Sequence, residues 1–249
     1  MKITSTNNEL VKETAKLLRS KSRDESGLFL IEGEKGVDEA ITAGVEIERI
    51  FVLEGVTTFL HENLIETNEA VLSKISDAKT APKVVAVAKQ IKQSIQNLSN
   101  SKRVVLLEGI NDAGNLGTII RTASAFGIDG IVLYGDTVDL YNPKCVRSTV
   151  GCLWKIPIIQ IKEMEELKSI FTPFERVATL PKGVNVISLN DYIPDEQALI
   201  MFGSEADGLS DELKDFATKN VTIEMQENVE SLNLSVSASI LMYKIRQVQ

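Results

Sequence analysis

Two patterns of apolar and polar positions alternate along the chain. Short apolar runs are typical of buried strands, and segments with apolar residues every three or four positions are typical of amphipathic helices. The apolar runs predict strands at 27–33, 47–55, 83–89, 104–110, 130–135, 155–161, 176–180, 197–203 and 221–225. The helical pattern predicts helices at 4–22, 34–44, 57–66, 69–78, 141–151, 163–171, 211–217 and 231–248, and a further helix within 111–127.

This alternation of strands and helices favours an α/β fold with a parallel sheet covered by helices on both faces. Residues 89–103 interrupt the pattern, because they are polar, rich in serine and poor in large apolar groups. Such a segment is typical of a linker between domains, and ordinary surface loops share its composition. We therefore place a domain boundary near residue 95, with a first domain over 1–95 and a second over 96–249.

The segment 111–127 has the local order of a ligand site. A buried strand leads into turn-forming residues and glycines, and then into a helix with an apolar face. A helix N-terminus presents unpaired N–H groups and a partial positive charge to a ligand. Asn115 is either the N-cap of this helix or a ligand-facing side chain, and Arg121 is either a packing residue or a functional group. Gly114 and Gly117 form GxxG, so this segment has neither the dinucleotide fingerprint nor the phosphate loop.

Polar loops follow three of the predicted strands, at 111–117, 203–210 and 223–235. Open α/β sheets bind ligands at the carboxyl ends of their strands, so these loops are expected to lie near one another. The glycines of the second loop allow close approach of the backbone to a ligand. The candidate polar side chains in these loops are Asn115, Glu205, Ser231 and Asn233. Capping explains Ser231 alone and does not explain the set, whereas Ser237 and Ser239 fit a packing role inside an apolar helix.

The composition is that of an ordinary soluble globular protein, with 249 residues, 43% hydrophobic and 25% charged. No apolar run reaches the length of a membrane span, and the N-terminus has no apolar signal core, so a cytoplasmic protein without a membrane partner is expected. His61 is the single histidine, and Cys145 and Cys152 are the only cysteines. A zinc or other metal site is therefore not expected.

The charge distribution leaves the question of a nucleic-acid partner open. The net charge of −8 argues mildly against phosphate binding. Residues 1–23 are nevertheless basic, and a local basic face can bind nucleic acid on an acidic molecule. A solvated helix face is the alternative explanation for this charge. The candidate RNA-binding residues are Lys12, Lys16, Arg19 and Arg23, with Lys144 and Arg147 from the later helix.

The three loops resemble the motifs of a known family. NLGTIIRTA, IMFGSEADGLS and IEMQENVESLNLSVSASI resemble the first, second and third motifs of the SpoU (TrmH-like) RNA ribose 2′-O-methyltransferases of the SPOUT superfamily. YNPKCVRSTVG resembles the segment between the first two motifs. VKETAKLLRSKSRDESGLFLIEG resembles the substrate-binding domain of that family, an α/β fold like that of RNA-binding ribosomal proteins. The resemblance covers nearly the whole chain.

This resemblance implies a fold, a cofactor and a set of site residues. The implied fold is α/β, with a C-terminal knotted (trefoil), mostly parallel sheet that has helices on both faces, and a smaller N-terminal α/β domain. The implied cofactor is bent S-adenosylmethionine (SAM), and the implied assembly is a homodimer with the last helix at its interface and sites shared across it. The implied catalytic residues are Arg121, Asn115, Glu205, Ser231 and Asn233. The implied cofactor-binding residues are Thr179, Leu180, Gly203, Gly208, Ile223, Met225 and Leu232.

Three positions depart from the family pattern. Glu224 stands where proline is common, Glu227 where glycine is common, and Asp207 where a small residue is usual. We therefore expect a more acidic cofactor loop. We also expect Arg121 to grip an RNA phosphate and position the 2′-hydroxyl, because a guanidinium holds its proton at neutral pH. Ribosomal RNA is favoured over transfer RNA by the N-terminal resemblance, and the alternatives are a non-catalytic RNA-binding protein and a small-molecule enzyme.

Overall fold

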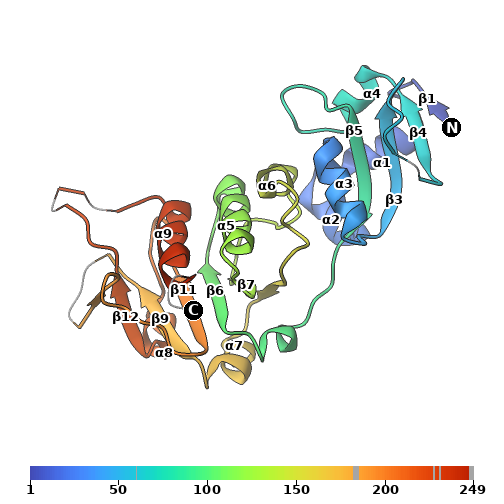
Figure 1. Ribbon diagram of the computed structural model, residues 1–249. Coiled ribbons are helices and arrows are strands. Elements are labelled where there is room, and N and C mark those ends of the chain that lie inside the picture. The colour runs from blue at the N-terminus through green and yellow to red at the C-terminus, as the bar shows by residue number, and fades with distance from the viewer. Residues whose placement is uncertain (60, 182–184, 227, 230, 247–249) are drawn as a thin grey trace. The chain divides into compact units, whose positions relative to one another are not determined.

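The computed structural model describes residues 1–59, 61–181, 185–226, 228–229 and 231–246. The chain packs into two units, which are coloured along the sequence in Figure 1. The first unit contains Met1–Lys92 and Asp139–Lys155, and the second contains Gln93–Val138 and Ile156–Gln249. The first unit therefore includes a segment from the middle of the sequence. The expected division into domains at residues 95 and 96 stays a prediction.

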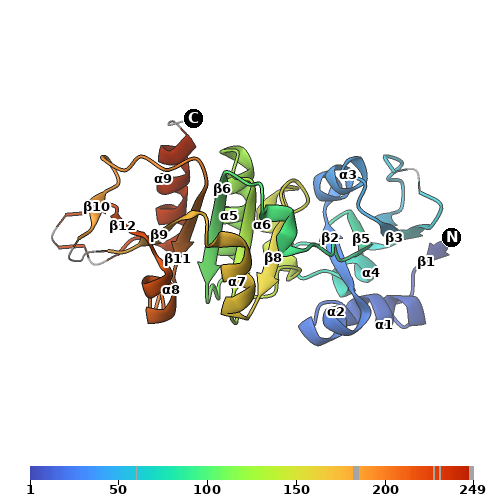
Figure 2. The ribbon, with the colours of Figure 1, turned by 90° about the horizontal axis from the view of Figure 1, so that it is seen from below.

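A five-stranded mixed sheet organises the first unit. Its strand order is β1 (Lys2–Ile3), β4 (Leu64–Thr67), β3 (Ile47–Leu53), β5 (Val84–Lys89) and β2 (Leu28–Glu32). The helices are α1 (Glu9–Lys16), α2 (Ser20–Ser26), α3 (Glu34–Thr42), α4 (Glu69–Lys74) and α6 (Pro143–Thr149). α1 and α2 lie on one side of the sheet and α3 on the other (Figure 2). The apolar side chains of α1 and α4 pack against Leu30, Phe51 and Val85.

The structure corrects two predictions in this unit. The single helix expected at 4–22 is wrong, because the chain forms α1 and α2 with a turn between them. The helix expected at 57–66 is also wrong: Leu64–Thr67 is strand β4, which pairs in parallel with β1 and β3. Strand pairing in the folded protein therefore overrides the local sequence pattern.

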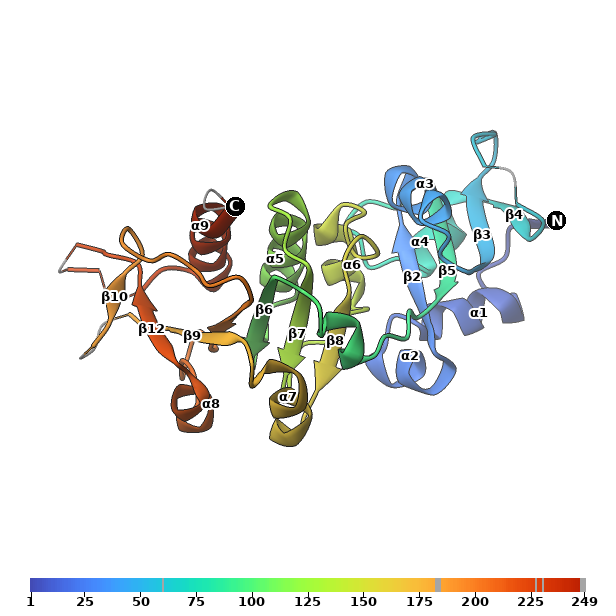
Figure 3. The ribbon, with the colours of Figure 1, turned by 60° about the horizontal axis from the view of Figure 1, so that its bottom comes forward.

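A seven-stranded sheet, parallel at every pairing, organises the second unit. Its order is β10 (Ile187–Ser188), β12 (Lys219–Thr222), β9 (Glu175–Thr179), β11 (Ala198–Phe202), β6 (Arg103–Glu108), β7 (Gly130–Tyr134) and β8 (Ile158–Ile161). Figure 3 shows helices α5 (Ala113–Ala125) and α9 (Leu234–Arg246) on one face, and α7 (Met164–Phe171) and α8 (Asp211–Phe216) on the other. A short 3₁₀ helix, Ile95–Leu98, precedes β6. The predicted α/β fold is confirmed; the expected knot stays a prediction.

The core of the second unit lies on both faces of this sheet. β7 and β11 are buried along their whole length, as expected for strands that are covered twice. α5 and α9 pack side by side on one face (Figure 1). The short strand β10 was not predicted, and β12 begins two residues before its predicted start. In the part of the chain that the structure describes, no helix is long and apolar enough to cross a membrane.

Candidate active site at the carboxyl edge of the parallel sheet

The first polar loop ends at a capped helix. Asp112 is the N-cap of α5, and its Oδ1 accepts a hydrogen bond of 2.8 Å from the backbone N–H of Asn115. A carboxylate at this position satisfies one of the unpaired N–H groups of the first turn and favours the positive end of the helix. Asn115 is thus the third residue of the helix and not its cap. Its side chain is available for the other polar loops.

The structure brings three of the predicted site residues together. Asn115 Nδ2 donates a hydrogen bond of 2.6 Å to Glu205 Oε1, and Asn233 Nδ2 donates one of 3.2 Å to Asn115 Oδ1. These residues are about 90 and 118 positions apart in sequence, so only the folded sheet can unite them. Each side chain comes from a different predicted loop. The expected convergence of the three loops at one edge of the sheet is therefore observed.

Two glycines shape the second loop. A Cβ atom on Gly203 would lie 1.9 Å from the backbone carbon of Gly208, so a side chain cannot be accommodated there. Gly208 has a φ of +68°, a conformation that glycine adopts at little cost. Its N–H donates to the Ser204 carbonyl at 3.1 Å, which closes the turn. The chain therefore folds back sharply and presents Glu205 at the tip.

A second set of bonds braces this edge. The backbone N–H of Ser210 donates to Glu108 Oε2 at 2.7 Å, which ties the second loop to the end of β6. The Tyr134 hydroxyl lies 3.3 Å from Glu212 Oε2. Burial, followed by the charge of Glu212 and this hydrogen bond, raises the pKa of Tyr134 to about 12. Tyr134 is consequently a neutral donor at physiological pH.

A cavity of about 730 Å³ opens between the second and third loops. This volume lies within the range typical of small-molecule sites. All seven predicted cofactor-binding residues line it, together with Glu205, Ser231 and Asn233: they are Thr179, Leu180, Gly203, Gly208, Ile223, Met225 and Leu232. Lys214 and Ser237 also line it, and the sequence analysis missed both. Ser237 was assigned to packing, and its position among apolar residues of the predicted helix gave no signal to the contrary.

The acidic departures fall on different parts of this region. Asp207 lines the cavity and is exposed. Glu224 is exposed, and its Oε2 accepts a hydrogen bond of 3.3 Å from Asn190 Nδ2. Glu224 is not among the residues that line the cavity, although Ile223 and Met225 on either side of it are. The third departure, Glu227, lies outside the described residues.

Arg121 stands apart from the other predicted site residues. It is exposed on α5 and makes no hydrogen bond or ion pair with any residue that the structure describes. It does not line the cavity. Ser231 does line the cavity and is exposed. A single chain thus forms the cavity and the cluster of Asn115, Glu205 and Asn233, and it leaves Arg121 exposed.

The candidate RNA-binding residues of the first unit differ in exposure. Lys12, Lys16 and Arg19 are exposed, and Lys144 is exposed on α6. Arg23 is only 2% exposed, donates to the Leu17 carbonyl at 2.8 Å and forms an ion pair with Asp139. Its assignment as an RNA-binding residue is therefore corrected, because its guanidinium holds Asp139 against α2 inside this unit.

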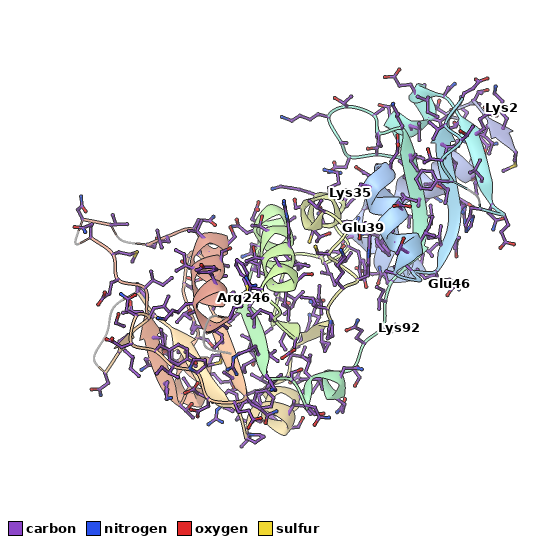
Figure 4. The ribbon with its side chains drawn as sticks, viewed as in Figure 1. Lys2, Lys35, Glu39, Glu46, Lys92 and Arg246 are labelled. Carbon is purple, nitrogen blue, oxygen red and sulfur yellow. The ribbon has the colours of Figure 1, made fainter. Side chains whose placement is uncertain are left out.

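Arg147 is half-buried and also engaged in the first unit. Its Nη1 lies 2.6 Å from Glu32 Oε2, and its Nη2 lies 3.3 Å from Asp77. The Glu32 side chain is 1% exposed, so this carboxylate depends on Arg147 for its charge partner. Figure 4 shows Lys35 and Glu39 on the neighbouring helix α3. Any contact of Arg147 with RNA would compete with the Glu32 pair.

The fold and the cavity define an α/β protein with a cavity of small-molecule size at the carboxyl edge of a parallel sheet. Two models of known families match it. The SpoU rRNA Methylase family matches residues 102–243, and an MRM3-like substrate binding domain matches residues 8–86. The chain belongs to the SpoU rRNA methylase family, which confirms the resemblance seen in the sequence.

Individual relatives match over nearly the whole chain. A 23S rRNA (guanosine(2553)-2′-O)-methyltransferase, RlmP, of Bacillus subtilis is 31% identical over 98% of this chain and 98% of its own. A tRNA/rRNA methyltransferase of Synechocystis is 30% identical over 99% of this chain and 94% of its own. The crystal structure of an AdoMet-bound rRNA methyltransferase from Sinorhizobium meliloti superposes with a TM-score of 0.90, at 29% identity, over 99% of this chain and 97% of that one.

Proposed function

We propose that this protein transfers a methyl group from S-adenosylmethionine to a ribose 2′-hydroxyl of ribosomal RNA. The observation that carries the proposal is the cavity at the carboxyl edge, which all seven predicted cofactor-binding residues line beside Glu205, Ser231 and Asn233. Membership of the SpoU family supports the same reaction.

The chemistry of the cavity fits the cofactor. Leu180, Ile223, Met225 and Leu232 offer apolar surface for an adenine ring, and the ends of the strands offer backbone donors and acceptors. Glu205 and Asp207 favour the positive charge of a sulfonium and an ammonium group. When bound, S-adenosylmethionine would supply an electrophilic methyl group to the 2′-oxygen, and its sulfur would leave with the bonding electron pair as the thioether of S-adenosylhomocysteine.

Arg121 positions the substrate in this mechanism. A guanidinium keeps its proton at neutral pH, so Arg121 acts as a clamp and not as a base. Its planar fork binds an RNA phosphate through two hydrogen bonds and places the adjacent 2′-hydroxyl for in-line attack. The proton of the hydroxyl passes to that phosphate. Asn115, Asn233 and Ser231 hold the polar wall beside the reacting groups.

The active form in this proposal is a homodimer in the cytoplasm. Support comes from α9, where Val236, Ile240 and Tyr243 are 45%, 39% and 50% exposed. Apolar side chains along one helix face are typical of a subunit interface. Arg121 is exposed and has no partner among the residues that the structure describes, which is consistent with a site that a second chain completes. We also propose that the C-terminal chain forms the trefoil knot of the family.

The first unit binds the RNA in this scheme. Its match to a substrate binding domain supports the assignment, and Lys12, Lys16 and Arg19 are exposed cations on or next to α1. Each phosphate contact releases counterions, so affinity for RNA should fall steeply with salt concentration. The RNA target is 23S-type ribosomal RNA, by analogy with the B. subtilis relative. Transfer RNA is the alternative substrate.

The test is transfer of labelled methyl groups from S-adenosylmethionine to unmodified ribosomal and transfer RNA pools. Wild-type protein is compared with Arg121→Ala. Lys168→Ala serves as a control, because Lys168 is an exposed cation on α7, on the opposite face of the same sheet (Figure 3). Label in the ribosomal pool that maps to a 2′-oxygen and is lost in Arg121→Ala is the expected result. Label in the transfer RNA pool alone would identify transfer RNA as the substrate.

Failure of the reaction would separate the alternatives. Salt-dependent RNA binding without methyl transfer to any RNA, including ribosome assembly intermediates, would indicate a non-catalytic RNA-binding protein. Cofactor binding without RNA binding at any salt concentration would indicate an enzyme that acts on a small molecule.

A further inference from the structure

The N-terminus of α9 fixes which way the Asn233 amide faces. Asn233 Oδ1 accepts hydrogen bonds from the backbone N–H groups of Ser235 at 2.9 Å and Val236 at 3.3 Å. A backbone N–H can only donate, so the side-chain atom facing these two groups must be the oxygen. The Ser235 hydroxyl, on a residue that is 8% exposed, donates to the same oxygen at 2.6 Å.

This orientation passes through Asn115 to Glu205. With its oxygen held by α9, Asn233 turns Nδ2 toward Asn115 and donates to Oδ1 at 3.2 Å. Asn115 must then present its own Nδ2 on the opposite side, where it donates to Glu205 Oε1 at 2.6 Å. Every bond in the chain runs in the same direction, from α9 toward Glu205. The carboxylate is the end of the chain because it can only accept.

We propose that Asn233 and Asn115 form a one-way hydrogen-bond relay, through which the N-terminus of α9 sets the position of Glu205 in the methyl-donor cavity. The proposal rests on the proposed function for the identity of the ligand. Asn115, Asn233 and Ser235 are positioning residues in this scheme, because they act through Glu205. The relay links α9, the helix that bears the exposed apolar face, to the loop that lines the cavity.

The direction of the relay gives it a specific weakness. In Asn233→Asp, one oxygen still accepts from α9, but the second oxygen faces the Asn115 oxygen. If the Asn115 amide turns over, its oxygen faces the Glu205 carboxylate instead. Two acceptors oppose each other in either arrangement, and in the second arrangement Glu205 also loses its donor. Adding Glu205→Gln supplies an N–H at the far end, so the two side-chain bonds of the relay can both reverse, while the N–H groups of α9 still donate to the side chain at position 233.

The experiment is a double-mutant cycle on the full-length protein. Affinity for S-adenosylmethionine is measured by calorimetry for the wild type, Asn233→Asp, Glu205→Gln and the double variant. Urea unfolding is measured on the same four proteins without cofactor or RNA. Asn228→Asp is the matched control, because it adds the same charge to the same loop, and Asn228 makes no hydrogen bond with any described residue.

A relay predicts rescue. Asn233→Asp should weaken cofactor binding at least about ten-fold, whereas Asn228→Asp should change it by less than about two-fold. The double variant should bind the cofactor less than about two-fold more weakly than Glu205→Gln alone. The urea midpoint should show the same pattern. A merely structural role for Asn233 would not produce this recovery.

Independent effects would overturn the relay. If Asn233→Asp costs the same with glutamate or glutamine at position 205, in binding and in unfolding, the two residues are not coupled. An Asn228→Asp effect as large as that of Asn233→Asp would show that added charge explains the loss. If the wild type binds no S-adenosylmethionine, the proposed function fails, and the unfolding cycle alone still supports or overturns the relay.

Discussion

The two edges of the parallel sheet carry similar charged residues and use them differently. At the amino edge, Arg103, Glu175 and Lys219 are the first residues of β6, β9 and β12. Arg103 is 6% exposed and donates to the Asp195 and Glu196 carbonyls at 2.7 Å each. At the carboxyl edge, Glu205 is exposed. Arg121, on the helix α5 that begins at this edge, is also exposed and has no partner among the described residues. The charged groups of the amino edge are thus bonded within the protein, whereas Glu205 and Arg121 are accessible to solvent.

This difference separates stability from function. Glu175 has a side chain that is 1% exposed, and it accepts from the Tyr192 hydroxyl at 2.7 Å and from the Asp195 N–H at 3.0 Å. Lys219 forms an ion pair with it. A buried charge must be paired in this way, because an unpaired one is very costly. An exposed arginine costs the fold little and remains free to bind a phosphate.

The largest expected effect is a loss of activity in Arg121→Lys. Lysine keeps the charge but cannot reproduce the bidentate fork, so methyl transfer should fall at least about 100-fold. The free energy of unfolding should change by less than about 0.5 kcal/mol, since the side chain is exposed. Transfer of labelled methyl groups and urea unfolding measure the two quantities.

Arg103→Lys is the matched control at the amino edge. The same substitution there should lower the free energy of unfolding by about 2 kcal/mol, because lysine cannot serve the carbonyls that the guanidinium binds. Methyl transfer per folded molecule should stay within about two-fold of the wild type, a range that allows for assay error. Near wild-type turnover by Arg121→Lys would contradict the functional role of the exposed arginine.

Glu175→Gln should have the second largest effect, on stability. The change keeps the shape of the side chain and removes the charge that Lys219 needs. We expect a loss of about 2 kcal/mol, below the usual range for a broken buried pair, because the Lys219 side chain is 35% exposed. Glu205→Gln makes the same chemical change at the carboxyl edge, and it should leave the urea midpoint nearly unchanged. Equal losses in the two variants would contradict a division of labour between the edges.

Most of this architecture could be predicted because its signals are local. The buried strands stand out as apolar runs, and the rule that parallel sheets bind ligands at their carboxyl ends gathered three distant loops into one site. The break between α1 and α2 gave no such signal, since Leu17 and Leu18 continue the helical pattern without glycine or proline. Strand β4 was missed because its pairing with β1 and β3 arises only in the folded sheet.

The cluster of charged residues at the amino edge could not be predicted from the sequence for a related reason. Arg103, Glu175 and Lys219 are charged residues at the ends of predicted strands, where exposed charges are common. Only the sheet order β12–β9–β11–β6 brings them together. Nothing in the sequence indicates that Arg23 is buried, because a buried arginine and a surface arginine look alike in a basic segment.

Alkaline pH should destabilise the amino edge. Burial, with the hydrogen bond to Glu175, raises the pKa of Tyr192 above its usual value of about 10. The stability from the neutral phenol is therefore complete below about pH 10 and is lost as the pH rises toward the folded-state pKa. The hydrogen bond between Lys219 and Glu175 likewise raises the pKa of Lys219. Loss of the Lys219 proton at alkaline pH therefore also lowers the stability of the fold.

Tyr192→Phe tests this prediction. The variant should lose about 1.5 kcal/mol at neutral pH, because a hydrogen bond to a buried carboxylate is removed. Its stability should then fall less steeply than that of the wild type between about pH 9 and 11, as measured by urea unfolding. Some slope should remain from Lys219. Parallel profiles for the two proteins would show that Tyr192 does not govern the alkaline response.

The smallest effect is expected at Asp112, where the two roles meet. Asp112 caps α5, so Asp112→Ala should lower the free energy of unfolding by about 1 kcal/mol. The same cap holds the backbone of Asn115, whose side chain donates to Glu205. Fraying of the first turn should therefore also weaken cofactor binding by about three-fold, a shift of under 1 kcal/mol. Asp112→Asn keeps a capping oxygen and should preserve both quantities. If Asp112→Ala lowers stability without changing cofactor affinity, the cap and the site are independent, and the carboxyl edge positions Asn115 through its side-chain bonds alone.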